Sequence, residues 1–166
     1  MFKIGDRVVY GIHGVCQICG LEERNVDRKT VQYYVLQPAD QAAAKYYVPS
    51  QNPAALAKLR PLMHKAELLE LLHSQEVLRD LWIPEEGKRK LAYREMISSG
   101  DRVALLSMIN TLHRHRKQCV EQGRKFHLCD ENFLRDAQRI LSAELSAILE
   151  IPISEVPAFV QHFFEA

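Results

Sequence analysis

The spacing of hydrophobic residues changes near residue 60, and this change divides the chain into two parts of different fold class. Before residue 60, short runs alternate apolar and polar residues and are bounded by Gly and Pro, which is typical of β-strands. After residue 60, apolar residues recur at intervals of three and four to the end of the chain, which is typical of α-helices. The pattern predicts a multi-domain α+β protein.

The first part predicts a small antiparallel sheet. Four runs rich in β-branched and aromatic residues predict strands at 7–10, 15–21, 30–36 and 45–49, with a polar turn at 22–29 between the second and the third. Four or five strands this short, with no helix among them, favour a strongly bent barrel of the SH3 or Tudor type. A barrel of this kind serves many partners and does not by itself indicate a function.

The second part predicts a bundle of about five helices. They are expected at 65–73, 88–98, 102–121, from 130 to 152, and from 154 onward. Gly100 and Asp101 are suited to end one helix and to cap the next. The core positions expected in the third helix are Leu105, Met108, Ile109 and Leu112. The predicted domains are therefore a sheet domain at 1–58, a linker at 59–64 and a helical domain at 65–166.

Composition limits the classes of function. With 47% hydrophobic and 26% charged residues, the chain is an ordinary globular protein. It has neither a long apolar run nor a leader at its N-terminus, so we expect a cytoplasmic protein without a membrane partner. No motif of a hydrolase nucleophile, phosphate loop or zinc protease is present, so we expect no enzyme, no catalytic residue, no cofactor, no bound metal and no small-molecule substrate. Cys16 and Cys19 form a C-x-x-C in an alternating apolar run, and all four cysteines are expected to be reduced thiols.

The net charge of +1 hides two strongly charged regions. Residues 86–126 hold ten cations and four anions, a net +6, whereas residues 127–166 hold two cations and seven anions, a net −5. A local excess of this size attracts a phosphate backbone. The stretch 81–94 places the only Trp beside four cations, which suits simultaneous contact with bases and phosphates. The predicted DNA-binding residues are Trp82, Lys88, Arg89, Lys90, Arg94, Arg114, Arg116, Lys117, Arg124 and Lys125.

Each of these features has a second interpretation that stays open at this point. A lone Trp is often a half-buried anchor of a core, and a charge run is often a solvated helix face. The cations at 113–117 lie in the last turns of a predicted helix, where they also complement the helix dipole. The basic helices could equally bind an acidic protein partner instead of DNA. His113 and His115 lie two apart on a helix, so they cannot bind one metal ion together.

Several motifs in order along the chain carry a resemblance to a known family. Residues 2–15 read F-K-x-G-D-x-V-V-Y-x-x-H-G-V, and they are followed by YYVL at 33–36, YVP at 47–49 and LRPLM at 59–63. The second half adds W-I-P at 82–84, Ser99-Gly100-Asp101, and A-x-x-I-L-x-x-E-L at 137–145. Over nearly its whole length the chain resembles the CarD and CdnL family of bacterial transcription regulators. The opening motif alone is shared by the RNA-polymerase-interacting domain of the Mfd repair translocase.

The resemblance implies two binding functions. The Tudor-like domain would bind the β subunit of RNA polymerase, and the helical domain would contact double-stranded promoter DNA at the upstream edge of the transcription bubble, in the nucleoid. In well-known members an exposed Trp wedges into the minor groove, a role that falls to Trp82 here and would stabilise the open complex. In mycobacterial members that Trp stands several residues nearer the Ser-Gly-Asp turn than Trp82 does.

The resemblance also implies which residues of the first domain contact the polymerase. Arg24 falls where the family places an arginine at the polymerase surface. Tyr47 occupies a second such position, where mycobacterial members have Arg, so backbone pairing by the exposed strand would have a larger share in binding. The predicted polymerase-binding residues are Arg24, Lys45, Tyr47, Val48 and Pro49.

Overall fold

The structure, a computed structural model, describes residues 2–39 and 41–165. It separates into two compact units, Met1–Leu62 and Met63–Ala166, called here the sheet unit and the helical unit. Leu59 to Pro61, expected in the linker, instead form a strand of the sheet unit because Leu59 is buried and pairs with Tyr10. A strand of three residues is too short to show an alternating pattern, and its pairing partner lies about 50 residues earlier in the sequence.

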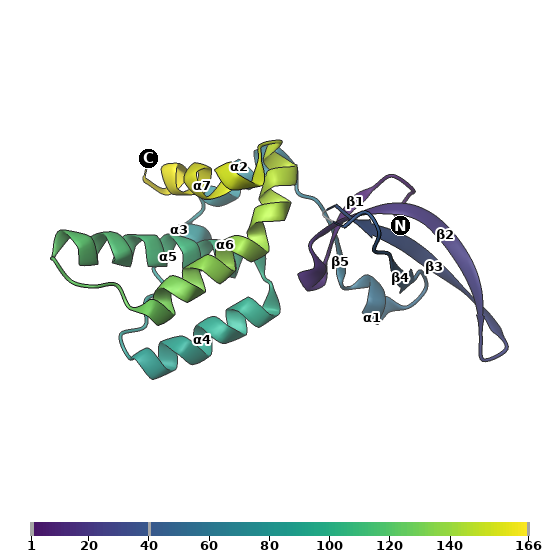
Figure 1. The fold of residues 1–166 in the computed structure, drawn as a ribbon, viewed down its shortest axis with the longest axis horizontal. Coiled ribbons are helices and arrows are strands. Elements are labelled where there is room, and N and C mark those ends of the chain that lie inside the picture. The colour runs from purple at the N-terminus through teal and green to yellow at the C-terminus, as the bar shows by residue number, and fades with distance from the viewer. Residues whose placement is uncertain (1, 40, 166) are drawn as a thin grey trace. The chain divides into compact units, whose positions relative to one another are not determined.

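Five strands build the sheet unit (Figure 1). They are β1 (Arg7–Tyr10), β2 (Val15–Val26), β3 (Lys29–Pro38), β4 (Tyr46–Pro49) and β5 (Leu59–Pro61). Every pair of neighbours is antiparallel, in the order β4-β3-β2-β1-β5. The predicted small antiparallel sheet is confirmed, and β4 and β5 are its edge strands. A short helix, α1 (Pro53–Leu56), connects β4 to β5, and the side chain of the preceding Asn52 caps it.

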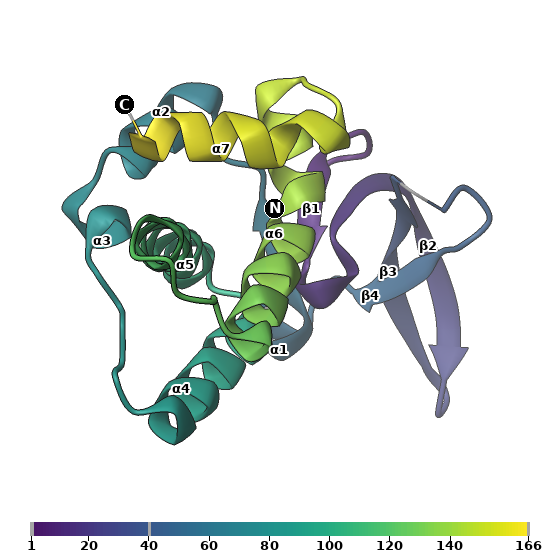
Figure 2. The ribbon, with the colours of Figure 1, turned by 60° about the vertical axis from the view of Figure 1, so that its left-hand side comes forward.

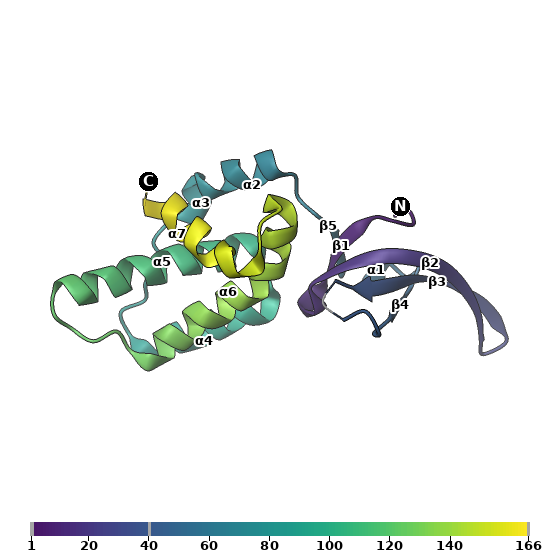
Figure 3. The same cartoon turned by 45° about the horizontal axis from the view of Figure 1, so that its top comes forward.

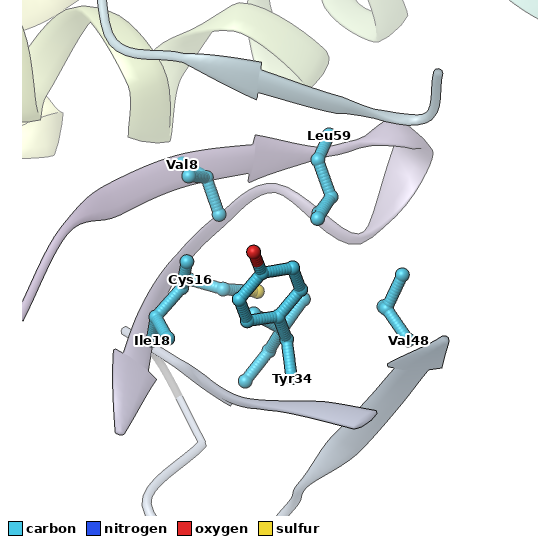
Figure 4. Close-up of a cluster of buried hydrophobic side chains, with 7 residues drawn as sticks. Val8, Cys16, Ile18, Tyr34, Val48 and Leu59 are labelled. Atoms are coloured by element: carbon cyan, nitrogen blue, oxygen red, sulfur yellow. The ribbon is translucent and has the colours of Figure 1, made fainter. Parts of the chain in front are cut away.

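Alternating residues of the strands form the core of the sheet unit (Figure 4). Val8 of β1 and Ile18 of β2 face Tyr34 of β3 and Val48 of β4, and each is at most 4% exposed. Burial of one such aliphatic side chain stabilises the fold by about 1.5–3 kcal/mol. The register of β2 against β3 shifts between Ile18 and Gly20, so a bulge bends the sheet at this point.

Beyond this core, β2 and β3 continue as a two-stranded ribbon (Figure 1). Residues 21–30 are all exposed, and the predicted polar turn at 22–29 is wrong, because residues 22–25 pair with β3. The chain turns only at Asp27 and Arg28, whose φ angles of 50° and 65° are those of a two-residue type I′ hairpin turn. Polar residues fill this part of the ribbon because both of its faces meet water. A polar stretch therefore does not show that the pairing of β2 with β3 has ended.

The described residues of the helical unit form six α-helices and one short 3-10 helix, η2 (Ile153–Glu155). The α-helices are α2 (Lys65–Leu72), α3 (Gln75–Leu78), α4 (Glu86–Ser99), α5 (Arg102–Glu121), α6 (Leu128–Leu149) and α7 (Val156–Glu165). Figure 2 shows α5 nearly end-on, with the other helices around it. The predicted core positions of α5 are confirmed, since Leu105, Met108, Ile109 and Leu112 are at most 2% exposed. In the described part of the chain, no helix combines the length and the apolar character needed to cross a bilayer.

The turn from α4 to α5 follows the predicted capping residues. Gly100 has a φ angle of 64° and donates its backbone N–H to the carbonyl groups of Met96 and Ile97, which ends α4. The Asp101 side chain accepts a hydrogen bond from the backbone N–H of Val103 (3.3 Å) and so caps α5. Both predictions are confirmed, and this tight turn makes α4 and α5 neighbours in the bundle.

Candidate functional site

An irregular segment between α3 and α4, residues 79–85, carries Trp82, and it is called here the Trp82 segment. Polar side chains of α4 and α5 hold its backbone. The bonds run from the Ser107 hydroxyl to the Arg79 carbonyl (3.0 Å), from the Leu81 N–H to the Thr111 hydroxyl (2.9 Å), and from the Tyr93 hydroxyl to the Leu81 carbonyl (3.2 Å). Burial raises the pKa of Tyr93 to about 12, so its hydroxyl stays protonated and keeps donating. A segment without regular structure is thereby fixed on two helices.

The Trp82 ring lies between two side chains. The His115 ring stacks on it at 3.8 Å between centroids and 16° between planes. The Arg89 guanidinium lies 4.2 Å from the centroid of the same ring. Two planar groups this close to the ring centre cannot share one face, so His115 and Arg89 cover opposite faces. Trp82 is half-buried, which leaves the edge of its ring as the part that meets solvent.

Arg89 is a buried structural residue, although its sequence suggested a cation on the surface. Its side chain is 2% exposed and donates twice to the Asp130 carboxylate, from Nε and Nη2, at 2.9 Å each. Nη1 donates to the carbonyl of Ile83 in the Trp82 segment (2.9 Å). Burial opposes the charge of Arg89, but the bonds and the charge of Asp130 raise its pKa on balance. Its donors are therefore not free to contact a phosphate, and Arg89 is withdrawn from the predicted DNA-binding set.

The imidazole that stacks on Trp82 is neutral at physiological pH. Burial lowers the pKa of His115, and Asp80, at 3.7 Å from Nε2, opposes this shift only in part. The contact between His115 and Trp82 is therefore an aromatic stack and not a cation–π interaction. The cation on Trp82 comes from Arg89 alone.

The remaining predicted cations of α4 mostly have carboxylate partners close by. Lys88 pairs with Glu85 at 3.2 Å, and Lys90 pairs with Glu86 at 3.1 Å. Arg94 is exposed, and no ion pair to it occurs in residues 2–39 and 41–165. Of the four cations that the sequence places on α4, Arg94 alone has no carboxylate partner among the residues that the structure describes.

The cations near the end of α5 divide differently. Arg116 pairs with Glu131 at 3.2 Å, and Arg114 donates to the carbonyl of Leu78 at 2.7 Å. Three further predicted residues are exposed and form no ion pair within the described part of the chain. They are Lys117, Arg124 and Lys125. The Arg124 guanidinium donates to the side-chain carbonyl of Gln122, an uncharged group, and no carboxylate among the described residues pairs with it.

A second candidate surface lies on the sheet unit. The Arg24 guanidinium lies 4.1 Å from the centre of the Tyr47 ring, so two predicted polymerase contacts meet. Arg24 is half-exposed, Tyr47 is 37% exposed, and Tyr47 belongs to the edge strand β4. Lys45, just before β4, is exposed, and Pro49 is half-buried. Val48 was predicted as a surface contact, but its side chain is 1% exposed and packs in the core (Figure 4). Its backbone is therefore the part that can bind a partner.

Two residues of the Trp82 site were missed by sequence reasoning. Asp130 resembled an ordinary acidic residue in the first turn of a helix, where it is favoured by the helix dipole. His115 stood within a run of cations and gave no sign of a stacking role. A pairing between Arg89 and Asp130, 41 residues apart, has no signature in one sequence, because α4 and α6 meet only in the folded bundle. Among the described residues, no group of three or more potential ligands is placed to hold a metal ion.

The sheet edge at β4 and the unpaired cations among the described residues are two candidate binding surfaces, and comparisons with known proteins indicate the class of protein to which they belong. Residues 2–63 match the family model described as the CarD-like/TRCF RID domain. Over 160 residues the chain is 24% identical to the "Putative transcription factor YdeB" of Bacillus subtilis (strain 168). The aligned region covers 96% of this chain and 99% of that protein. These matches support a role in transcription and point to a transcription factor rather than an enzyme. Both matches support a CarD-like family for this chain, with the family model confined to residues 2–63.

Proposed function

We propose that this protein is a transcription regulator that binds the β subunit of RNA polymerase through its sheet unit and promoter DNA through its helical unit. The observation that carries the proposal is the contact between Arg24 and Tyr47 on an exposed surface beside the edge strand β4. The match of residues 2–63 to the CarD-like/TRCF RID domain supports RNA polymerase as the partner of this surface. Simultaneous binding of polymerase and DNA would stabilise the open complex.

The polymerase half of the proposal uses the chemistry of a sheet edge. An edge strand presents backbone N–H and C=O groups, which an extended segment of a partner can pair with. Arg24 and Tyr47 would flank this backbone contact with a charged and an aromatic group. Their cation–π contact, worth about 0.5–1 kcal/mol at an exposed site, holds both side chains in one arrangement before the partner arrives.

The DNA half rests on the helical unit. Its uncompensated cations supply attraction to phosphates, and the Trp82 segment supplies a rigid aromatic group. Because His115 and Arg89 cover both faces of the Trp82 ring, this ring would reach DNA with its exposed edge. Trp82 would then act as a fixed wedge against the minor groove, and not as a ring stacked between bases.

Binding of the full chain to the isolated β-subunit lobe tests the polymerase half. We expect Arg24→Glu to weaken this binding about tenfold or more, since it reverses a charge at the contact surface. Lys29→Glu is the matched control, because Lys29 is an exposed cation of the same ribbon, away from Tyr47 in the pairing register. It should change the affinity less than about threefold.

Two outcomes would count against this half. Equal affinities of Arg24→Glu and the wild-type protein would remove the Arg24 and Tyr47 surface from the contact. No binding of the wild-type protein to the lobe would remove the polymerase claim itself and leave only DNA as a partner.

A further inference from the structure

The basic helical unit has two groups of predicted cations, and their electrostatic states differ. On α4, Lys88, Arg89 and Lys90 each have a carboxylate within 3.2 Å. At the end of α5 and in the turn that follows it, Lys117, Arg124 and Lys125 have no ion pair in the described part of the chain. A compensated cation adds little to the attraction of a phosphate, since its carboxylate repels the same phosphate.

The second group also lies at a projecting end of the helical unit. The last turns of α5 and the turn to α6 project beyond the other helices of this unit (Figure 1 and Figure 3). Residues 117–125, called here the α5 tip, are all exposed except Cys119, which is half-buried. Gly123, at a φ angle of 65°, ends the helix, and the Arg124 N–H donates back to the Cys119 carbonyl (2.7 Å). The cations of the tip are therefore carried on an ordered helix end.

The helix dipole does not account for Lys117. The dipole favours cations within the last turn of a helix, and the last turn of α5 contains no basic residue. Lys117 precedes that turn, and α5 ends at Glu121, an acidic residue, which the dipole disfavours at this end. The dipole interpretation applies to Arg124 alone, just past the end of the helix.

The composition of the tip distinguishes between a nucleic acid and a protein partner. A protein interface needs an apolar core of its own, and Val120 is the one large hydrophobic side chain exposed on the tip, at 74%. Phosphate contacts need only accessible cations and little shape complementarity. A projecting end with three uncompensated cations fits the backbone of a duplex better than the surface of an acidic protein.

We propose that the α5 tip is the main phosphate-binding surface of this protein for double-stranded DNA, and that the lysines of α4 contribute little. This inference rests on the DNA half of the proposed function and assigns its electrostatic contact to particular residues. Lys117 and Lys125 supply the test, because α4 offers a matched pair of lysines in Lys88 and Lys90.

The experiment measures the affinity of the full chain for a labelled duplex over a series of salt concentrations. Each phosphate contact contributes a slope of about −0.9 to the plot of log K against log salt concentration. We expect Lys117→Ala/Lys125→Ala to reduce this slope by about 2 and to weaken binding by about tenfold or more at low salt. Lys88→Ala/Lys90→Ala, which removes the same number of lysines, should change the slope by less than about 0.5.

The outcomes separate this inference from the proposed function. An unchanged slope for the α5 tip variant, or an equal loss for the α4 variant, would overturn the inference while DNA binding stands. If the wild-type protein binds no duplex at any salt concentration, both the inference and the DNA half of the proposed function are wrong. Binding of polyglutamate by the wild-type protein, with no binding of DNA, would identify the tip as a site for an acidic protein. Circular dichroism should show both variants folded, because Lys88, Lys117 and Lys125 are exposed and none of the four lysines is buried.

Discussion

Helix α4 and the α5 tip look alike in the sequence and differ in the folded protein. Each carries lysines and an arginine within a few residues. In α4 the sequence also supplies Glu85 and Glu86, which lie three and four positions before a lysine and therefore pair with it on one helix face. The α5 tip contains one carboxylate, Glu121, and it pairs with none of the cations described there. Local pairing, and not the count of cations, decides which basic segment presents a positive field.

Arg89 extends this contrast into the core. It lies in the same basic run as Lys88 and Lys90, but it faces inward and joins α4, α6 and the Trp82 segment. The Arg89 side chain thus neutralises the buried Asp130, donates a hydrogen bond to the Ile83 carbonyl and covers one face of the Trp82 ring. Removal of Arg89 should therefore have the largest effect on stability of any cation in α4.

We expect Arg89→Met to destabilise the helical unit by about 3–5 kcal/mol, because it leaves the Asp130 carboxylate buried without a partner. Urea denaturation, followed by Trp82 fluorescence and by circular dichroism, measures this loss. The double variant Arg89→Met/Asp130→Leu should recover most of it, since it removes both buried charges. Arg139→Met is the control, because its ion pair with Asp136 is exposed and worth less than about 1 kcal/mol. A loss for Arg89→Met no larger than that of the control would contradict the buried role.

The next largest expected effect is the change of folding stability with pH that His113 of α5 causes. Burial lowers the pKa of His113 to about 4, from about 6.5 in the unfolded chain. The Arg116 guanidinium lies 3.1 Å from His113 Nδ1, and the Gln138 side-chain amide nitrogen lies 3.2 Å from His113 Nε2. The stability that this neutral form contributes is complete above pH 6.5 and is lost as the pH falls toward 4, because the unfolded state then binds the proton more readily.

We therefore expect the wild-type protein to lose up to about 3 kcal/mol more between pH 7 and pH 4 than His113→Gln, which has no titrating group at this position. Urea denaturation at several pH values gives both curves, and the other titrating groups cancel in their difference. The difference must grow as the pH falls. Parallel curves for the two proteins would show that His113 is not held neutral by the fold.

The longer helices and the core of α5 could be predicted from the sequence because their signals are local, whereas the four-residue α3 is too short to show a helical period and was not predicted. Apolar spacing located α5 and its four core residues, and Gly100 with Asp101 located the turn before it. The ribbon of β2 and β3 could not be located in this way. Its residues 22–25 pair through their backbone while their side chains meet water on both faces, so they lack the alternation that identifies a half-buried strand.

The candidate sites show the same limit. Arg24 and Tyr47 were each identified by resemblance, but their contact arises from the register, which aligns β2, β3 and β4 so that both side chains share a face. The covering of Trp82 depends on His115, 33 residues later, and on Arg89, whose inward direction is decided by Asp130 of α6. Such contacts between distant segments follow from packing, and no spacing rule in one sequence encodes them.

The smallest expected effect tests the pairing that separates α4 from the α5 tip. A double-mutant cycle on Lys88 and Glu85, with each replaced by Ala singly and together, should give a coupling of about 0.2–0.5 kcal/mol at low salt, as for other paired residues on one helix. Lys117 and Glu121 are the matched pair on α5, four positions apart with the lysine first, an orientation that pairs poorly. No ion pair joins them in the described residues, so their coupling should stay below about 0.2 kcal/mol.

Both cycles are measured by urea denaturation, and the coupling of Lys88 with Glu85 should shrink as salt is added, because screening weakens an exposed ion pair. A coupling of Lys117 with Glu121 as large as that of the α4 pair would mean that the tip lysine is compensated in solution too. The electrostatic difference between the two segments would then disappear, and with it the reason to place DNA phosphates at the α5 tip and not along α4.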